Sequence, residues 1–200
     1  MKIQILSDLH LEFGEYQIAE TDADVIVLAG DIDVGIRALH WMITQTDKPI
    51  IYVLGNHEYY HQAYPDLQET IRELCQDTNI HFLENDAIII DGVRFLGCTL
   101  WTDYKLFDTQ KTSMIMAQSL MNDFTLIRPS DENQIRVKAQ EFLDAHEESI
   151  AFLKEELKDS TPTVVVTHHA PSHQSSEKCY DSSPVALSFA SNLKALIEQY

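Results

Sequence analysis

Residues 25–33 read VIVLAGDID, and this stretch decides the fold class. Five apolar residues, three of them β-branched, run without a break from Val25 to Ala29. Such a run is typical of a strand buried on both faces of a parallel sheet. It ends at Gly30-Asp31, a turn dipeptide that places a carboxylate directly after the strand. The stretch therefore predicts an α/β protein with polar chemistry at the carboxyl end of a strand.

The same arrangement recurs on both sides of this stretch. Apolar runs predict strands over 2–7 and 49–54, and helical spacing predicts a helix over 35–46, which together suggest βαβ crossovers. Asp91-Gly92 predicts a hairpin and hence a second sheet. The remaining expected elements are a helix over 65–77, strands over 80–83, 87–90, 93–96 and 163–167, and a last helix over 185–199.

Two helical regions are less regular. Residues 131–158 predict a long amphipathic helix with Ile135 on its apolar side. Residues 108–129 have a weak pattern with three methionines, which favours a surface helix that fills a packing gap over a cap above a site.

Size and composition indicate one globular domain over residues 1–200. The chain has 200 residues, is 44% hydrophobic and contains six Gly and six Pro. No apolar run approaches the roughly 20 residues that span a bilayer, and the first ten residues are too short in apolar length for a secretory signal. Three scattered cysteines without a CxxC pair fit a reducing compartment. We therefore expect a cytoplasmic protein with no membrane partner.

Charge restricts the partners. The formal net charge is −18, from 32 acidic and 14 basic residues. This field repels nucleic-acid backbones and anionic membranes, so nucleic acid is disfavoured as a partner. A small phosphoester held mainly by metal ions remains compatible with this negative net charge, because bound cations are often the largest local charges in a site.

Four predicted strands end in polar residues of metal-ligand type. These clusters are Asp8-Leu9-His10, Gly30-Asp31-Ile32-Asp33, Gly55-Asn56-His57-Glu58 and His168-His169. Each alone is weak evidence, since GD and GN are common turn dipeptides. Four together are hard to explain by chance, and ligands of open α/β sheets bind at the carboxyl ends of the strands. We therefore expect the clusters to converge.

The ligand types indicate transition-metal chemistry. Mixed carboxylate, imidazole and amide ligands suit Mn²⁺, Fe or Zn²⁺ better than calcium or a thiolate zinc site. Two such ions about 3.5–4 Å apart can activate a bridging water and stabilise an in-line displacement at phosphorus. Asp31, which lies between the other clusters, is the candidate for a bridging carboxylate.

The strand-end clusters together resemble the motifs of a known family. Asp8-x-His10, Gly30-Asp31, Gly55-Asn56-His57-Glu58 and His168, in this order, resemble the calcineurin-like metallophosphoesterases, and the resemblance covers nearly the whole chain. It implies a four-layer αββα sandwich with a dinuclear centre. It also implies roles, listed here: Asp8 and His10 on the first metal, Asp31 bridging, Asn56 and His168 on the second, and His57 as a proton donor or transition-state stabiliser at the phosphate.

One motif of the family is missing. No Gly-His-x-His, which would supply one His to each metal, occurs after His173. The chain therefore matches five of seven expected ligands plus His57. We expect a C-terminally incomplete domain that lacks its last strands and has an impaired site.

Neighbouring residues have weaker assignments. Asp33 and Glu58 are interpreted either as partners that orient His ligands or as solvated acids. His169 is interpreted as a supporting or structural residue, and His61 and His173 as exposed with possible substrate contact. We expect no function for His40, His81 and His146.

Three functions stay open. The first is metal-dependent hydrolysis of a small or nucleotide phosphoester. A Ser/Thr protein phosphatase is disfavoured because the GDxxDRG arginine is missing. The alternatives are a catalytically dead scaffold or binding module, favoured by the missing motif, and a mononuclear metal-binding protein.

Overall fold

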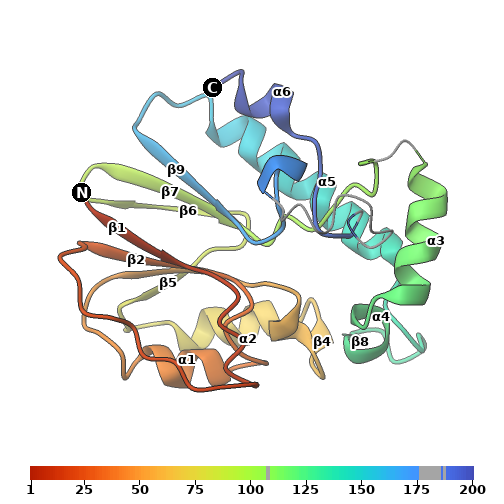
Figure 1. Cartoon of the computed structure of the whole chain (residues 1–200), viewed down its shortest axis with the longest axis horizontal. Helices are drawn as coiled ribbons and strands as arrows, with labels where there is room; N and C mark the ends of the chain where they lie inside the picture. The colour runs from red at the N-terminus through yellow and green to blue at the C-terminus, as the bar shows by residue number, and fades with distance from the viewer. Residues whose placement is uncertain (107–108, 176–185, 187) are drawn as a thin grey trace.

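The computed structural model describes residues 1–106, 109–175, 186 and 188–200, and its strands form two main sheets (Figure 1). The first sheet is parallel, in the order β1 (Ile3–Leu6), β2 (Val25–Ala29), β3 (Ile50–Val53) and β5 (Ile80–Phe82). The second has the order β6 (Asp86–Ile90), β7 (Val93–Cys98) and β9 (Thr163–Thr167), with β6 antiparallel and β9 parallel to β7. Two short strands, β4 (Ala63–Tyr64) and β8 (Arg128–Pro129), form a separate pair.

The layers follow from the alternation of side chains along the strands. Val25 and Val27 of β2 pack inward against Phe95 and Val166 of the second sheet. The intervening Ile26 and Leu28 face the other way, into a cluster that includes the buried side chains of α1 (Arg37–Met42) and α2 (Leu67–Leu74). A parallel strand covered on both faces in this way is apolar throughout.

The outer face of the second sheet is covered by α5 (Ala139–Glu156), whose Leu153 packs on Leu96 and Cys98. The short helix α6 (Lys194–Ile197) lies beside α5 in the same layer (Figure 1). The order of layers is therefore helix, sheet, sheet, helix, which confirms the predicted αββα sandwich. In the described part of the chain, no helix is both long and apolar enough to cross a bilayer.

The long helix begins later than predicted. Ile135 is 94% exposed and precedes α5, so its placement on the apolar side of a helix was wrong. Lys138 is extended, and its backbone N–H donates to the Glu141 carboxylate, which ends the loop and starts the helix at Ala139.

The last predicted helix was also too long. Of residues 185–199, residues 185 and 187 lie outside the described part, and α6 covers only Lys194–Ile197. Ala170 accounts for part of the difference, because its N–H donates to the Phe189 carbonyl and its carbonyl accepts from the Ser191 N–H. These tertiary bonds use backbone groups that a helix would need.

Residues 109–129 form α3 (Gln110–Leu120) and α4 (Asp123–Leu126), and residues 107–108 are outside the described part. Within the described residues, single-turn 3-10 helices lie at His57–Tyr59 and His173–Ser175.

Candidate metal centre

The turns after β1 and β2 are locked together by backbone hydrogen bonds. The Asp8 N–H donates to the Gly30 carbonyl at 3.1 Å, and the His10 N–H donates to the Asp31 carbonyl at 3.0 Å. Asp8, His10 and Asp31 have φ values of 52°, 48° and 54°, in the left-handed region that non-glycine residues rarely adopt. Strain of this kind persists where surrounding structure enforces it, often at functional sites.

Asp31 lies at the centre of the predicted residues and is 4% exposed. Its Oδ2 lies 3.8 Å from Nε2 of His10 and 4.0 Å from Nε2 of His57. Its Oδ1 lies 3.5 Å from Nε2 of His168. Asp8 completes the first group, with Oδ1 4.0 Å from the same His10 nitrogen. The two oxygens of one carboxylate thus face two different sets of potential ligands, and Asp8, His10 and Asp31 have the spacing of a metal-ligand group.

Two glycines permit this close approach. A Cβ on Gly30, where φ is +83°, would lie 2.5 Å from Nδ1 of His168. A Cβ on Gly55 would lie 2.1 Å from Oδ1 of Asp31. Space therefore requires a glycine at both positions, and at Gly30 the positive φ requires it as well.

His168 and Asn56 form the second group. Nδ1 of His168 lies 3.0 Å from the Ala29 carbonyl, which accepts a hydrogen bond from the N–H at that nitrogen, so the lone pair of the neutral ring is on Nε2. This Nε2 lies 3.3 Å from Oδ1 of Asn56. The Asn56 amide nitrogen points the other way and donates to Oδ1 of Asp123 at 2.9 Å and to the Tyr60 hydroxyl at 3.3 Å. Its oxygen is therefore directed toward His168.

Asp123 was not predicted as a site residue. It lies in α4 and is 4% exposed, and its Oδ1 also accepts the Tyr60 hydroxyl at 2.9 Å. The region that carries it was interpreted as a surface helix. Its one signal in the sequence is an acid beside a buried aromatic, Phe124, in a segment with no clear period.

Glu58 connects the turns after β2 and β3. Its fully buried carboxylate accepts the backbone N–H groups of Asp31, Ile32 and Gly55 at 3.0, 2.8 and 2.8 Å, and the Tyr52 hydroxyl at 3.1 Å. Both interpretations of Glu58 were wrong, because it is not solvated and orients backbone rather than a histidine. Burial raises its pKa to about 7.

The electrostatics of the centre fit a bound cation. Burial, together with the charges of Asp8 and Asp123, raises the pKa of Asp31 to about 7, although the His57 backbone N–H opposes this by donating to Oδ1 at 2.9 Å. Burial likewise raises the pKa of Asp123. A divalent ion would offset the cost of keeping such carboxylates ionised, and oxygen and imidazole donors suit Mn²⁺, Fe or Zn²⁺.

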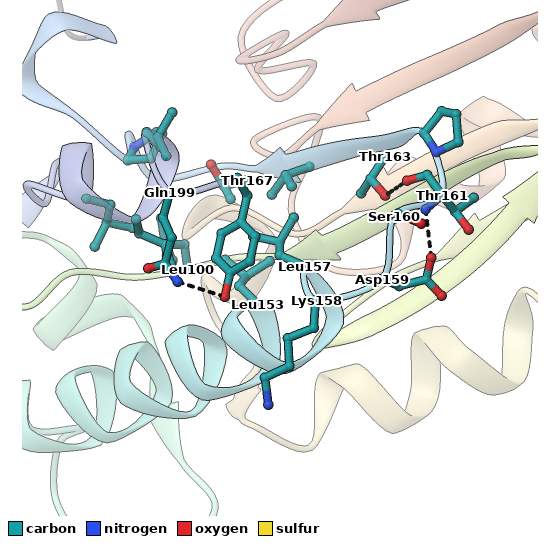
Figure 2. Close-up of a pocket in the computed structure, with 17 residues that line it drawn as sticks. Leu100, Leu153, Leu157, Lys158, Asp159, Ser160, Thr161, Thr163, Thr167 and Gln199 are labelled. Atoms are coloured by element: carbon teal, nitrogen blue, oxygen red, sulfur yellow. Dashed lines mark hydrogen bonds between the residues drawn. The ribbon is translucent and has the colours of Figure 1, made fainter.

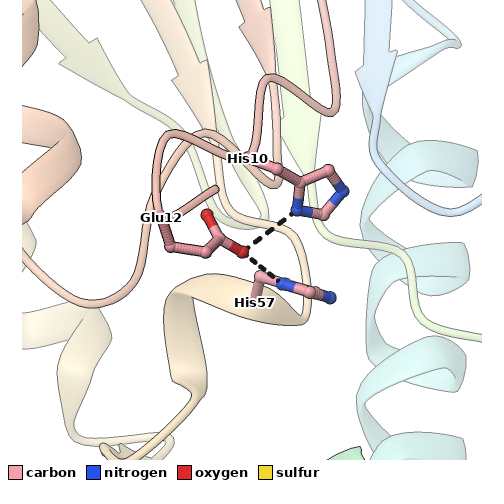
Figure 3. Close-up of side chains that lie close together, drawn as sticks. All are labelled: His10, Glu12 and His57. Carbon is pink, nitrogen blue, oxygen red and sulfur yellow. Dashed lines mark hydrogen bonds and ion pairs between the residues drawn. The ribbon is translucent and has the colours of Figure 1, made fainter. Parts of the chain in front are cut away.

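His57 lies beside the first group, and Glu12 lies between it and His10 (Figure 3). One oxygen of Glu12 is 2.7 Å from Nδ1 of His57 and 3.1 Å from Nδ1 of His10. Burial lowers the pKa of His57, and the hydrogen bond to Glu12 opposes this. Glu12 was not among the predicted residues, although it stands only two positions after His10.

The other nearby residues have structural partners. Asp33 accepts the Val34 N–H and pairs with Arg37, so it orients no histidine. His169 is 4% exposed, with Nδ1 3.3 Å from the Thr99 carbonyl and its ring against Trp101. His61, His173 and His40 are exposed, His81 is half-buried, and the buried His146 lies 2.9 Å from the Leu100 carbonyl.

A cavity of about 770 Å³ lies elsewhere, between β9, α5 and α6 (Figure 2). Its lining is mainly apolar, with side chains such as Leu153, Leu157 and Leu196, and includes no strand-end candidate. The potential metal ligands therefore lie outside this cavity.

An αββα sandwich with carboxylate, imidazole and amide side chains gathered at its strand ends defines a metallophosphatase-like protein. The sequence matches the model of the calcineurin-like phosphoesterase family over residues 1–197, and the chain belongs to that family. Members hydrolyse phosphoesters with the help of metal ions.

Two relatives are similar in sequence, and the second carries the name of the family. An uncharacterized protein of Acanthamoeba polyphaga mimivirus is 27% identical over 98% of this chain and 80% of its own length. An uncharacterized metallophosphoesterase of Helicobacter pylori is 26% identical over 48% of this chain and 29% of its own length.

Proposed function

We propose that this chain hydrolyses a phosphomonoester or phosphodiester of a small molecule or nucleotide, using two divalent ions, in the cytoplasm. Asp8, His10 and Asp31 would hold one ion, and Asp31, Asn56 and His168 the other. The observation that carries the proposal is the Asp31 carboxylate, whose Oδ2 faces His10 while Oδ1 faces His168. Each ion would have three ligands from this chain, a number found in catalytic zinc sites.

The ions would polarise the phosphoryl oxygens and supply an activated water. The chain's own residues prepare the site for this chemistry. Glu58 fixes the turn that carries Asp31, and Asp123 directs the Asn56 oxygen inward. His57 presents Nε2 4.0 Å from Asp31 Oδ2, at the edge of the same space, where the ring, once protonated on both nitrogens, can donate a proton to a departing oxygen.

A small substrate is favoured by two features. The net charge of −18 repels long polyanions. Phe13 is 80% exposed with its ring centroid 6.0 Å from that of His10, which places an apolar surface beside the centre for an organic substituent.

A second candidate is a binding module with little or no turnover. The feature that favours it is that the 200 residues contain no Gly-His-x-His motif. The buried and oriented state of Asp31 and Asn56 argues against it, since binding a partner protein does not require it.

Hydrolysis of bis(4-nitrophenyl) phosphate and 4-nitrophenyl phosphate, with Mn²⁺, Fe²⁺ or Zn²⁺ added, tests the proposal. His57→Ala should lower turnover by roughly 10²- to 10⁴-fold while metal content is kept. His40→Ala, at an exposed histidine, should have no effect. Metal binding without any hydrolysis by the wild-type protein would contradict the proposal and favour the binding module.

A further inference from the structure

We infer that Glu12 is a positioning residue that holds both His10 and His57 in the tautomer with the proton on Nδ1. The inference rests on the proposed function for its purpose, but its evidence is the hydrogen-bond geometry. A single carboxylate oxygen of Glu12 receives both imidazoles (Figure 3). A carboxylate only accepts hydrogen bonds, so each Nδ1 must carry the proton. Each Nε2 is then left with its lone pair.

Both Nε2 atoms point toward the same group. They lie 3.8 Å and 4.0 Å from Oδ2 of Asp31, for His10 and His57 respectively. The two rings meet edge to face with centroids 4.4 Å apart. Glu12 thus orients both Nε2 atoms toward the centre, where that of His10 is suited to bind an ion and that of His57 to transfer a proton.

The backbone places Glu12 where this is possible. Leu11 N–H donates to the Ile32 carbonyl at 2.9 Å, and Phe13 N–H donates to the His10 carbonyl at 2.8 Å. With His10 at a φ of 48°, this turn folds Glu12 back beneath the His10 ring. The turn thus keeps the Glu12 carboxylate within hydrogen-bond distance of both histidines.

The carboxylate is specialised for this contact. Its side chain is 12% exposed, and within the part of the chain that is described its Oε2 is buried without a hydrogen-bond partner. A buried oxygen without a partner costs free energy, which the hydrogen bonds at Oε1 must offset. Metal-binding histidines almost always donate their second ring N–H to an acceptor such as the Oε1 of this carboxylate, and loss of that acceptor lowers the affinity for the metal by about 10- to 100-fold.

A competing interpretation is that Glu12, His10 and His57 themselves hold an ion, since their spacing permits it. The distances of 2.7 and 3.1 Å from one oxygen to the two Nδ1 atoms are those of N–H···O bonds. An ion bound to Nδ1 of both rings would leave the proton of each neutral imidazole on Nε2, so His10 could not bind a second ion through that nitrogen.

Long-range ¹H–¹⁵N NMR of the metal-free protein at about pH 8, where histidine is ordinarily neutral, tests the inference. His10 and His57 should both be protonated on Nδ1 in the wild type. Glu12→Ala should shift both toward the Nε2-protonated form, and Glu12→Gln, which keeps an acceptor oxygen, should restore the original tautomer. Glu15→Ala, at an exposed acid of the same loop, should change neither.

Unchanged tautomers in a folded Glu12→Ala variant would overturn the inference. So would zinc titration that perturbs Nδ1 rather than Nε2 of the two histidines, since that result indicates the competing site. Because the tautomer experiment needs neither ion nor substrate, a protein that shows the predicted tautomers but no hydrolysis would refute the proposed function and support the role of Glu12.

Discussion

An alanine at position 55 would place its Cβ 2.1 Å from Oδ1 of Asp31 and 2.6 Å from the Asp31 backbone nitrogen. Cβ atoms essentially never approach other heavy atoms closer than 3.0 Å, so the two turns must separate by about 0.9 Å at Oδ1. The contacted atoms cannot simply rotate away. The backbone N–H of Asp31 donates a hydrogen bond to the Glu58 carboxylate, and Oδ1 accepts one from the His57 N–H.

Gly55→Ala should lower both the stability of the protein and the activity of the site. Overpacking of a close-packed interior costs about 1–3 kcal/mol, which for a chain of this size lowers Tm by roughly 2–12 °C. A displacement near 1 Å at a reacting centre costs about 100-fold in turnover. Because Asp31 would serve both ions, metal affinity should fall more than the stability loss alone explains.

The assay compares calorimetric Mn²⁺ titration, thermal unfolding and hydrolysis in two variants. Gly14→Ala is the matched control, since a Cβ there meets nothing within 4 Å. Wild-type metal affinity in Gly55→Ala would refute the reasoning that Gly55 exists to admit the Asp31 carboxylate. An equal loss in Gly14→Ala would refute it as well.

Removing the Asp123 carboxylate as Asp123→Ala frees the Asn56 amide to rotate, so one ion should bind about 10- to 100-fold more weakly in calorimetric titrations, whereas Tyr60→Phe should leave affinity nearly unchanged. Equal losses would argue against Asp123 as the orienting group. Glu84→Gln keeps an oxygen for the Thr99 N–H and hydroxyl but cannot ionise. Burial raises the Glu84 pKa from 4.5 to about 7, so the wild-type protein loses stability as the pH rises between these two values. Between about pH 4 and a pH above 8, the stability of Glu84→Gln relative to wild type should therefore rise by about 3 kcal/mol in denaturant titrations. A stability difference that does not change with pH would contradict this.

The sheet layers could be predicted because burial on both faces leaves a local pattern. The runs at 25–29 and 163–167 match β2 and β9 at both ends. Asp8 and Asp31 converge because they follow the neighbouring parallel strands β1 and β2. His168 follows β9 of the second sheet and meets Asp31 because the two sheets pack face to face. In these cases a short window of sequence carries the physical cause.

Glu12 and Asp123 could not be predicted in the same way. The position of Glu12 depends on a left-handed residue at His10, and Asp123 meets Asn56 across 67 positions of chain. Ile135 shows the opposite error, a residue predicted in an element to which it does not belong. The apolar spacing extends N-terminal to Ala139, but the helix begins only where the Glu141 side chain caps it. Hydrogen bonds determined these three outcomes, tertiary ones at Glu12 and Asp123 and a local one at Glu141, and no periodicity reports them.

The central claim is that one carboxylate, Asp31, is shared by two ions. Electron paramagnetic resonance of the Mn²⁺-loaded protein tests it most directly, because two ions joined by a carboxylate are spin-coupled. The account predicts two Mn²⁺ per chain with a coupled spectrum that Asp31→Asn abolishes. A single uncoupled Mn²⁺ in the wild type, or a coupled pair that survives in Asp31→Asn, would contradict it.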